Sequence, residues 1–228
     1  RWGVPALKAE DRQYNQRIPA LLEYVRVNRL NREAIAAPSR TLGIVTSGKA
    51  YLDVMQALED LGLDAARCRE LGVSVFKVAM PWPLEPETLC EFAEGHREIL
   101  VVEEKRPVIE DQIASLFVNR ANAPLLTGKT GPDGSPLVPA IGETTPLIAA
   151  RSIAARLIAL TGDDGLRAAL DGLEAESAPP ALPAATLARM PSFCAGCPHN
   201  RSTKVPDGSV AFGGIGCHGM ATFLPERN

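Results

Sequence analysis

The chain has 228 residues, of which 46% are hydrophobic and 22% are charged, a balance that allows one or two domains with a buried core and argues against general disorder. The formal net charge is only -3, so no basic surface for nucleic acid is expected. No apolar run is long enough to span a bilayer and no signal peptide opens the chain, so no membrane association is expected and the predicted compartment is the cytosol.

The first segment, residues 1–38, carries apolar residues at helical spacing: Ile18, Leu21, Leu22, Val25 and Leu30. This pattern predicts a lead-in helix or the tail of a preceding domain, before Pro38 interrupts it. Because the sequence begins at Arg1 and not at Met, we expect it to be an internal piece of a longer protein.

Between residues 39 and 175, short apolar runs alternate with amphipathic segments. The apolar runs predict strands at 42–45, 73–78 and 99–102. The amphipathic segments predict helices at 49–61, 84–93, 108–118, 145–160 and 163–173. This alternation is typical of an α/β domain with a parallel sheet and right-handed crossovers. A long loop, rich in Gly, Pro and Thr, is expected at 127–146.

Few side chains of the α/β region point to chemistry, and none is predicted to be catalytic. Ser47 is interpreted as the cap of a helix N-terminus, because the turn around it has no phosphate-binding motif. Glu103, at the end of a predicted strand, is expected in a solvated loop or an interdomain ion pair. Cys68 and Cys90 are expected to be small buried hydrophobes, and His96 is expected on the surface near a helix end.

Residues 176–192 contain several prolines and many alanines, which predicts a linker between two domains. The strongest functional signal follows this linker, in residues 193–228. Cys194 and Cys197 are separated by two residues, and Gly196 between them allows a tight turn. Cys217 adds a third thiol after a Gly-rich approach, and His199 and His218 lie beside thiols.

Three interpretations of this cysteine pattern remain open from the residues alone. The first is a 4Fe–4S cluster held by the three cysteines and a fourth one beyond residue 228. The second is a zinc ion, with His199 or His218 as the fourth ligand. The third is a redox-active pair of thiols, or no metal at all. Soft thiolates favour iron–sulfur clusters and zinc over other metals.

Four segments also resemble one known family. The runs FCAGCPHNRSTKVPDG at 193–208 and GIGCHGM at 214–220 closely resemble the large, single-chain indolepyruvate:ferredoxin oxidoreductases, which belong to the 2-oxoacid:ferredoxin oxidoreductases. The runs LGIVTSGKAYLD at 42–53 and VVEEKRPVIED at 101–111 are similar to the same family. The resemblance covers most of the chain, and its cysteine block is the most specific part.

The resemblance implies a domain layout and a set of site residues. Residues 39–175 would be a transketolase C-terminal-like α/β domain, and residues 193–228 would begin a domain that binds the diphosphate end of thiamine diphosphate. The implied cluster ligands are Cys194, Cys197 and Cys217. The residues implied near the cofactor are His199, Ile215, Gly216, Cys217 and His218. The α/β domain itself is expected to be architectural.

The resemblance also implies a reaction, its cofactors and its partners. The full-length enzyme would oxidatively decarboxylate indolepyruvate or a related aryl 2-oxoacid to an acyl-CoA, using thiamine diphosphate with Mg²⁺ and coenzyme A. Electrons would pass through the 4Fe–4S cluster to ferredoxin, and the protein is expected to be a homo-oligomer. The family's Mg²⁺ motif and fourth cluster cysteine are absent from these 228 residues, so the chain alone is expected to be inactive. The alternative function is a zinc-stabilised interaction module joined to a structural α/β domain.

Overall fold

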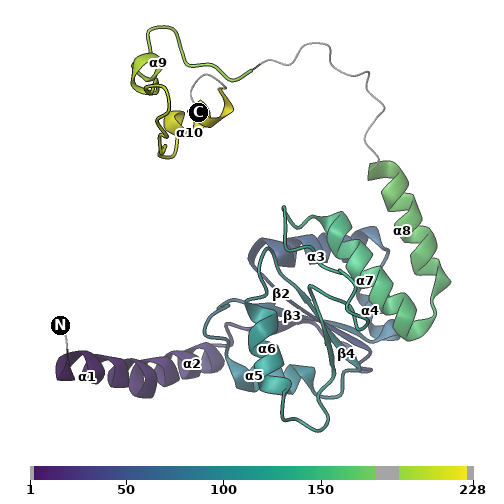
Figure 1. Ribbon diagram of the computed structural model, residues 1–228. Helices are drawn as coiled ribbons and strands as arrows, with labels where there is room; N and C mark the ends of the chain where they lie inside the picture. Colours follow the sequence, from purple (N-terminus) through teal and green to yellow (C-terminus); the bar gives the residue numbers. More distant parts are fainter. Residues whose placement is uncertain (1–2, 178–189, 225–228) are drawn as a thin grey trace. The chain divides into compact units, whose positions relative to one another are not determined.

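Helices and strands alternate along most of the chain in a computed structural model that describes residues 3–177 and 190–224 (Figure 1). The chain divides into two compact units, Arg1–Ala178 and Pro179–Asn228. The predicted linker at 176–192 falls mostly on residues 178–189, which lie outside the described residues. Among the helices that are described, none combines the length and the apolar character needed to cross a membrane.

The chain begins with a long helical segment formed by α1 (Val4–Arg12), the π-helical turn η1 (Gln13–Arg17) and α2 (Ile18–Val27) (Figure 1). Pro19 explains the wider turn, because it has no N–H to donate and its ring crowds the carbonyl four residues earlier. The backbone N–H of Ile18 donates to the carbonyl of Gln13, five residues back. The expected lead-in helix is therefore present, and it ends at Val27.

The central sheet has five strands: β1 (Arg32–Ile35), β2 (Leu42–Ser47), β3 (Val73–Val78), β4 (Glu98–Val102) and β5 (Leu125–Thr127). Their order across the sheet is β1-β3-β2-β4-β5. All neighbouring strands are parallel except β1, which runs antiparallel to β3. The predicted α/β class with a parallel sheet is confirmed. One detail of the prediction was wrong: residues 32–35 belong to the sheet as β1, although they lie in the segment that was interpreted as a lead-in.

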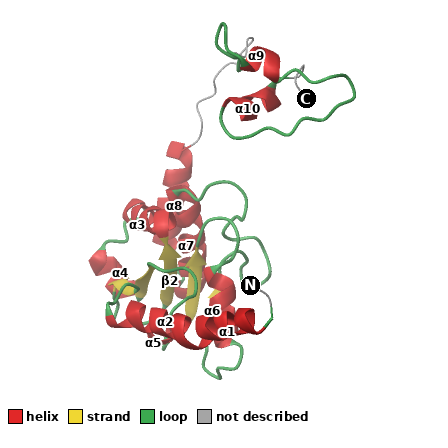
Figure 2. Ribbon diagram, turned by 90° about the vertical axis from the view of Figure 1, so that its left-hand side faces the viewer, coloured by secondary structure: helices red, strands yellow, loops and turns green. Residues whose placement is uncertain are grey.

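Two hydrophobic clusters cover opposite faces of the sheet, because side chains alternate along each strand. Ile44 and Leu100 pack with the helices of one face, while Val45 and Val101 pack with those of the other. The first face is covered by α3 (Gly48–Asp60), α4 (Ala65–Leu71), α7 (Pro146–Thr161) and α8 (Asp164–Ser177). The second face is covered by α5 (Pro86–Ala93) and α6 (Ile109–Phe117) (Figure 2). Each fully buried aliphatic side chain stabilises the fold by about 1.5–3 kcal/mol.

Glycines and capping side chains define several helix ends, and some of these residues can be recognised in the sequence. Gly72 adopts φ +76° and ends α4, where a side chain would meet Ser39 and Thr41. The side chain of Asp64 caps the start of the same helix by accepting the N–H of Arg67 at 2.8 Å. Ser47 precedes α3 as predicted, but its side chain makes no capping bond, so that part of the interpretation is wrong.

Two titratable side chains of the α/β unit are buried where the sequence predicted exposure. His96 is 5% exposed, because its ring packs against Phe92 and against the space left by Gly43. Glu103 is 6% exposed. Cys68 is fully buried as expected, and its thiol donates to the carbonyl of Leu63. Cys90 is only half-buried and lies at a surface pocket.

The second unit contains only short helices among its described residues 190–224: α9 (His199–Ser202), α10 (Cys217–Met220) and η2 (Ala221–Phe223). Of its described side chains, only Leu224 is buried. Large apolar residues such as Phe212 and Ile215 are almost fully exposed. This unit therefore has little hydrophobic core within its described residues.

Candidate metal and cofactor site

The first part of the candidate site is a tight turn that carries Cys194 and Cys197. The backbone N–H of Cys197 donates to the carbonyl of Cys194 at 3.1 Å, and Gly196 allows the turn by adopting φ +75°. The side-chain amide of Asn200 also donates to the carbonyl of Cys194, at 3.0 Å. Asn200 was not predicted to have a role, although its position directly after the cysteine motif was a signal. These bonds fix the backbone from which both thiols extend.

His199 connects this turn to the second cysteine segment. Its Nδ1 lies 3.2 Å from the sulfur of Cys197, and its ring stacks on Phe193 with centroids 5.7 Å apart. The same ring meets the edge of the His218 ring at 5.0 Å. Since His218 directly follows Cys217, the two histidines bring the segments of Cys197 and Cys217 side by side. Phe193, which supports His199, was not predicted as a site residue.

The second cysteine segment turns sharply before α10. Gly216 adopts φ +85°, a conformation that favours glycine, and Cys217 is the first residue of the helix. Gly213 lies against the backbone of His218, where an added Cβ would be 3.2 Å from the carbonyl oxygen. A hollow of about 130 Å³ opens beside His218 and is lined in part by Thr203 and Phe212. Glycines therefore allow close backbone approach around His218.

The thiols and imidazoles of this segment are the ligand types that a soft metal prefers. In the structure, however, these side chains do not converge on one point. Cys194, Cys197 and Cys217 are all free thiols, and two imidazoles lie beside them. Across residues 3–177 and 190–224, no group of three or more Cys, His, Asp or Glu side chains converges closely enough to hold a metal ion. The three cysteine ligands therefore stay a prediction.

The residues predicted near the cofactor are only partly brought together. His199 and His218 are in contact, and Gly216 and Cys217 lie next to His218 along the chain. The side chain of Ile215 is fully exposed to solvent and covers none of them. Their approach to thiamine diphosphate is therefore also a prediction.

A second group of titratable residues lies where the parallel strands β4 and β5 end. The carboxylate of Glu103 accepts the backbone N–H groups of Ile109, at 2.9 Å, and of Glu110, at 3.0 Å. The carboxylate of Glu103 thus accepts backbone N–H groups that have no partner within α6. The expectation that Glu103 lies in a solvated loop or an interdomain ion pair is therefore wrong. The negative charge is held by the first turn of a helix, and no interdomain partner is needed.

Glu110 and Lys129 complete this group. The Glu110 carboxylate accepts the backbone N–H of Lys129 at 2.9 Å, and the Lys129 ammonium donates to the carbonyl of Glu103. Burial raises the pKa of Glu110 and lowers the pKa of Lys129. Their bonds tie the start of α6 to the end of β5. Their role is therefore structural.

Comparison with known proteins gives the family. The model of the indolepyruvate oxidoreductase domain matches residues 32–178, which is more than half of the chain and begins at β1. The indolepyruvate oxidoreductase subunit IorA of Methanothermobacter marburgensis is 30% identical over 197 residues. The subunit of the same name from Thermococcus kodakarensis is 28% identical over 191 residues. The two alignments cover 86% and 82% of this chain, but only 28% and 26% of the relatives.

Solved structures show weaker similarity. A 2-oxoglutarate:ferredoxin oxidoreductase from Magnetococcus marinus, with 2-oxoglutarate, coenzyme A and succinyl-CoA bound, has a TM-score of 0.45 at 14% identity, over 69% of this chain and 24% of that chain. A split gene transketolase, described as an inactive beta4 tetramer, has a TM-score of 0.36 at 18% identity, over 61% of this chain and 42% of that one.

The curated relatives that match this chain are named as subunits of oxidoreductases. The chain belongs to the indolepyruvate oxidoreductase family. It spans about a quarter of the length of the curated relatives it matches.

Proposed function

We propose that this chain is part of an enzyme that oxidatively decarboxylates indolepyruvate or a related aryl 2-oxoacid to an acyl-CoA. Electrons leave through an iron–sulfur cluster to ferredoxin. The family assignment supports the substrate class, because the matched relatives are indolepyruvate oxidoreductase subunits. Coenzyme A is the acyl acceptor in this proposal, and ferredoxin is the partner protein.

The contact between His199 and His218 is the observation that carries the proposal. It draws together two segments that hold Cys197 and Cys217, although 18 residues lie between the two histidines in the sequence. Three thiolates in such a place suit an iron–sulfur cluster, which selects soft sulfur ligands. Cys194, Cys197 and Cys217 are therefore the proposed ligands, with the fourth position supplied from outside these 228 residues.

The same segment is proposed to face thiamine diphosphate, which, when bound with Mg²⁺, supplies the electron sink for decarboxylation. Gly216 has no side chain, so its backbone can approach a flat ring closely. His199 and His218 carry ring N–H groups that can hydrogen-bond to the substrate carboxylate or hold a proton near it. The exposed apolar side chain of Ile215 is suited to cover a bound ring and exclude water.

The α/β unit is proposed to be an architectural, transketolase C-terminal-like domain. Its titratable residues Glu103, Glu110 and Lys129 are used in helix capping and loop attachment, which supports this role. We also propose that the full-length protein assembles as a homo-oligomer. The 228 residues alone are inferred to be inactive, because the relatives that carry the name of the activity are about three times as long.

The test is turnover by a polypeptide of the relatives' full length that carries this sequence, purified without oxygen. It should reduce ferredoxin when given indolepyruvate and coenzyme A together, and a Cys217→Ser variant should lose this activity. Cys68→Ser serves as the control, because Cys68 is buried in the α/β core and is not one of the proposed ligands. Equal activity in the Cys217→Ser and unaltered proteins would contradict the proposal, as would turnover by the 228 residues alone.

A further inference from the structure

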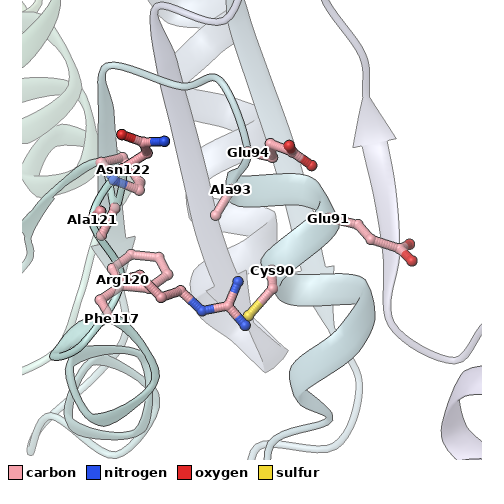
Figure 3. A pocket seen from close by; sticks show the side chains of 10 residues that line it. Cys90, Glu91, Ala93, Glu94, Phe117, Arg120, Ala121 and Asn122 are labelled. Atoms are coloured by element: carbon pink, nitrogen blue, oxygen red, sulfur yellow. The ribbon is translucent and has the colours of Figure 1, made fainter.

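A pocket of about 420 Å³ lies on the α/β unit, between the end of α5 and the segment that joins α6 to β5 (Figure 3). Its walls include Cys90 and Ala93 from α5, and Phe117, Arg120 and Pro124 from the other side. Both helices finish here before their next strands begin, so the pocket lies at the amino ends of β4 and β5. Glu103 and Lys129 lie at the other end of these strands, after their carboxyl ends. The volume of the pocket is within the range of small-molecule sites.

Cys90 and Arg120 face each other across this pocket. Figure 3 shows the guanidinium group of Arg120 beside the sulfur of Cys90, while the carboxylates of Glu91 and Glu94 point away from Arg120. Arg120 forms no ion pair with any carboxylate in the described parts of the chain. The pocket therefore combines a nucleophilic atom with an available positive charge.

The electrostatics of Cys90 differ from those of the buried Cys68. Burial raises the pKa of the Cys90 thiol, and the positive charge of Arg120 opposes this effect by favouring the thiolate. Burial raises the pKa of Cys68 to about 11, and that side chain has no exposed surface. In the α/β unit, Cys90 is thus the thiol that both meets solvent and has a cation beside it.

We propose that this pocket is a site of reversible thiol modification, where Cys90 forms a mixed disulfide with a small disulfide molecule whose carboxylate pairs with Arg120. The Cys90 thiolate attacks one sulfur of the disulfide, and its proton has gone to solvent. The original sulfur–sulfur bond breaks, a new one joins Cys90 to one half of the molecule, and the other half leaves as a thiolate. Phe117 and Ala93 offer an apolar wall for the attached half.

The experiment uses the 228-residue chain with Cys194→Ser, Cys197→Ser and Cys217→Ser, so that thiols of the second unit do not react. The probe is dithiobis(nitrobenzoate), an aromatic disulfide with carboxylates, and the uncharged dithiodipyridine is its counterpart. The folded protein should release one equivalent of leaving group from either reagent, a coloured thiolate from the first and a thiopyridone from the second. Adding Cys90→Ser should abolish the release. A folded chain that releases none would overturn the proposal.

The role of Arg120 is tested by the ratio of two reaction rates of Cys90, one with the anionic disulfide and one with the uncharged disulfide. Arg120→Gln should lower the rate with the anionic reagent, relative to the uncharged one, by about fivefold, the effect of one unit charge near 4 Å in water. Arg120→Lys should keep most of the ratio. Arg106→Gln is the matched control, because it removes the same charge just before α6 instead of just after it. A ratio that stays unchanged in Arg120→Gln, with circular dichroism showing an intact fold, would refute recognition of the carboxylate.

Discussion

Replacing Arg156 by methionine should destabilise the α/β unit strongly, because Arg156 neutralises a carboxylate in the protein interior. Glu98, the first residue of β4, has no exposed surface. Arg156 on α7 donates to both of its carboxylate oxygens, from Nε at 2.7 Å and from Nη2 at 2.8 Å. The hydroxyl of Thr127 donates to the same carboxylate at 2.6 Å. Removing the cation leaves a buried negative charge with that single hydroxyl bond.

The expected loss is about 3–5 kcal/mol, the usual result of removing one partner from a buried ion pair. This is a large share of the ~5–15 kcal/mol by which a domain is normally stable. Arg151→Met is the matched control on the same helix. Arg151 pairs with Glu174, but their side chains are 52% and 42% exposed, so its loss should cost less than about 1 kcal/mol.

The assay is urea unfolding at neutral pH, followed by far-ultraviolet circular dichroism and analysed as a two-state transition. A double variant, Glu98→Leu with Arg156→Met, should recover much of the lost stability, because it buries no unpaired charge. Two results would contradict a large stabilising role for Arg156. One is a loss in Arg156→Met no larger than in Arg151→Met, and the other is a double variant less stable than Arg156→Met alone.

Further predictions concern His96 and two glycines. Burial, with the nearby charge of Arg40, lowers the pKa of His96 from 6.5 to about 4, so stability should be lost as pH falls through this range, since the unfolded chain binds the proton first. His96→Gln should remove this part of the pH dependence in urea titrations between pH 7 and pH 4, roughly the range set by the two pKa values; an unchanged slope would count against it. Gly43→Ala should cost about 1–3 kcal/mol, because its Cβ would lie 2.6 Å from Ile99. Gly172→Ala, in α8 with open space around it, should instead stabilise by about 0.5–1 kcal/mol, and equal unfolding midpoints for the two variants would contradict this contrast.

The sequence was sufficient to predict the strands and helices that have a strong hydrophobic pattern. The strands β2, β3 and β4 are buried on both faces, so apolar residues predominate in each of them. The edge strand β1 is mostly exposed and β5 has only three residues, so neither has a recognisable pattern. The helix α4 has seven residues, too few for its periodicity to be recognised.

Burial of single polar residues could not be predicted, because it depends on contacts between distant segments. His96 is enclosed because Gly43, on a neighbouring strand, has no side chain. Glu103 is enclosed because the chain turns back into α6 and offers its N–H groups. In the second unit, the cysteine spacing predicted soft donors, but the contact of His199 with His218 depends on the path of a Gly-rich loop that carries no periodic signal.

The amounts of iron and acid-labile sulfide in the full-length protein, prepared without oxygen, show whether the three cysteines hold an iron–sulfur cluster. Both elements should be present in equal amounts, and both should be lost when Cys194, Cys197 or Cys217 is replaced by serine. Cys90→Ser should leave them unchanged. Stoichiometric zinc without sulfide would instead support a zinc-stabilised interaction module, and would contradict the role of these three cysteines as ligands of an iron–sulfur cluster.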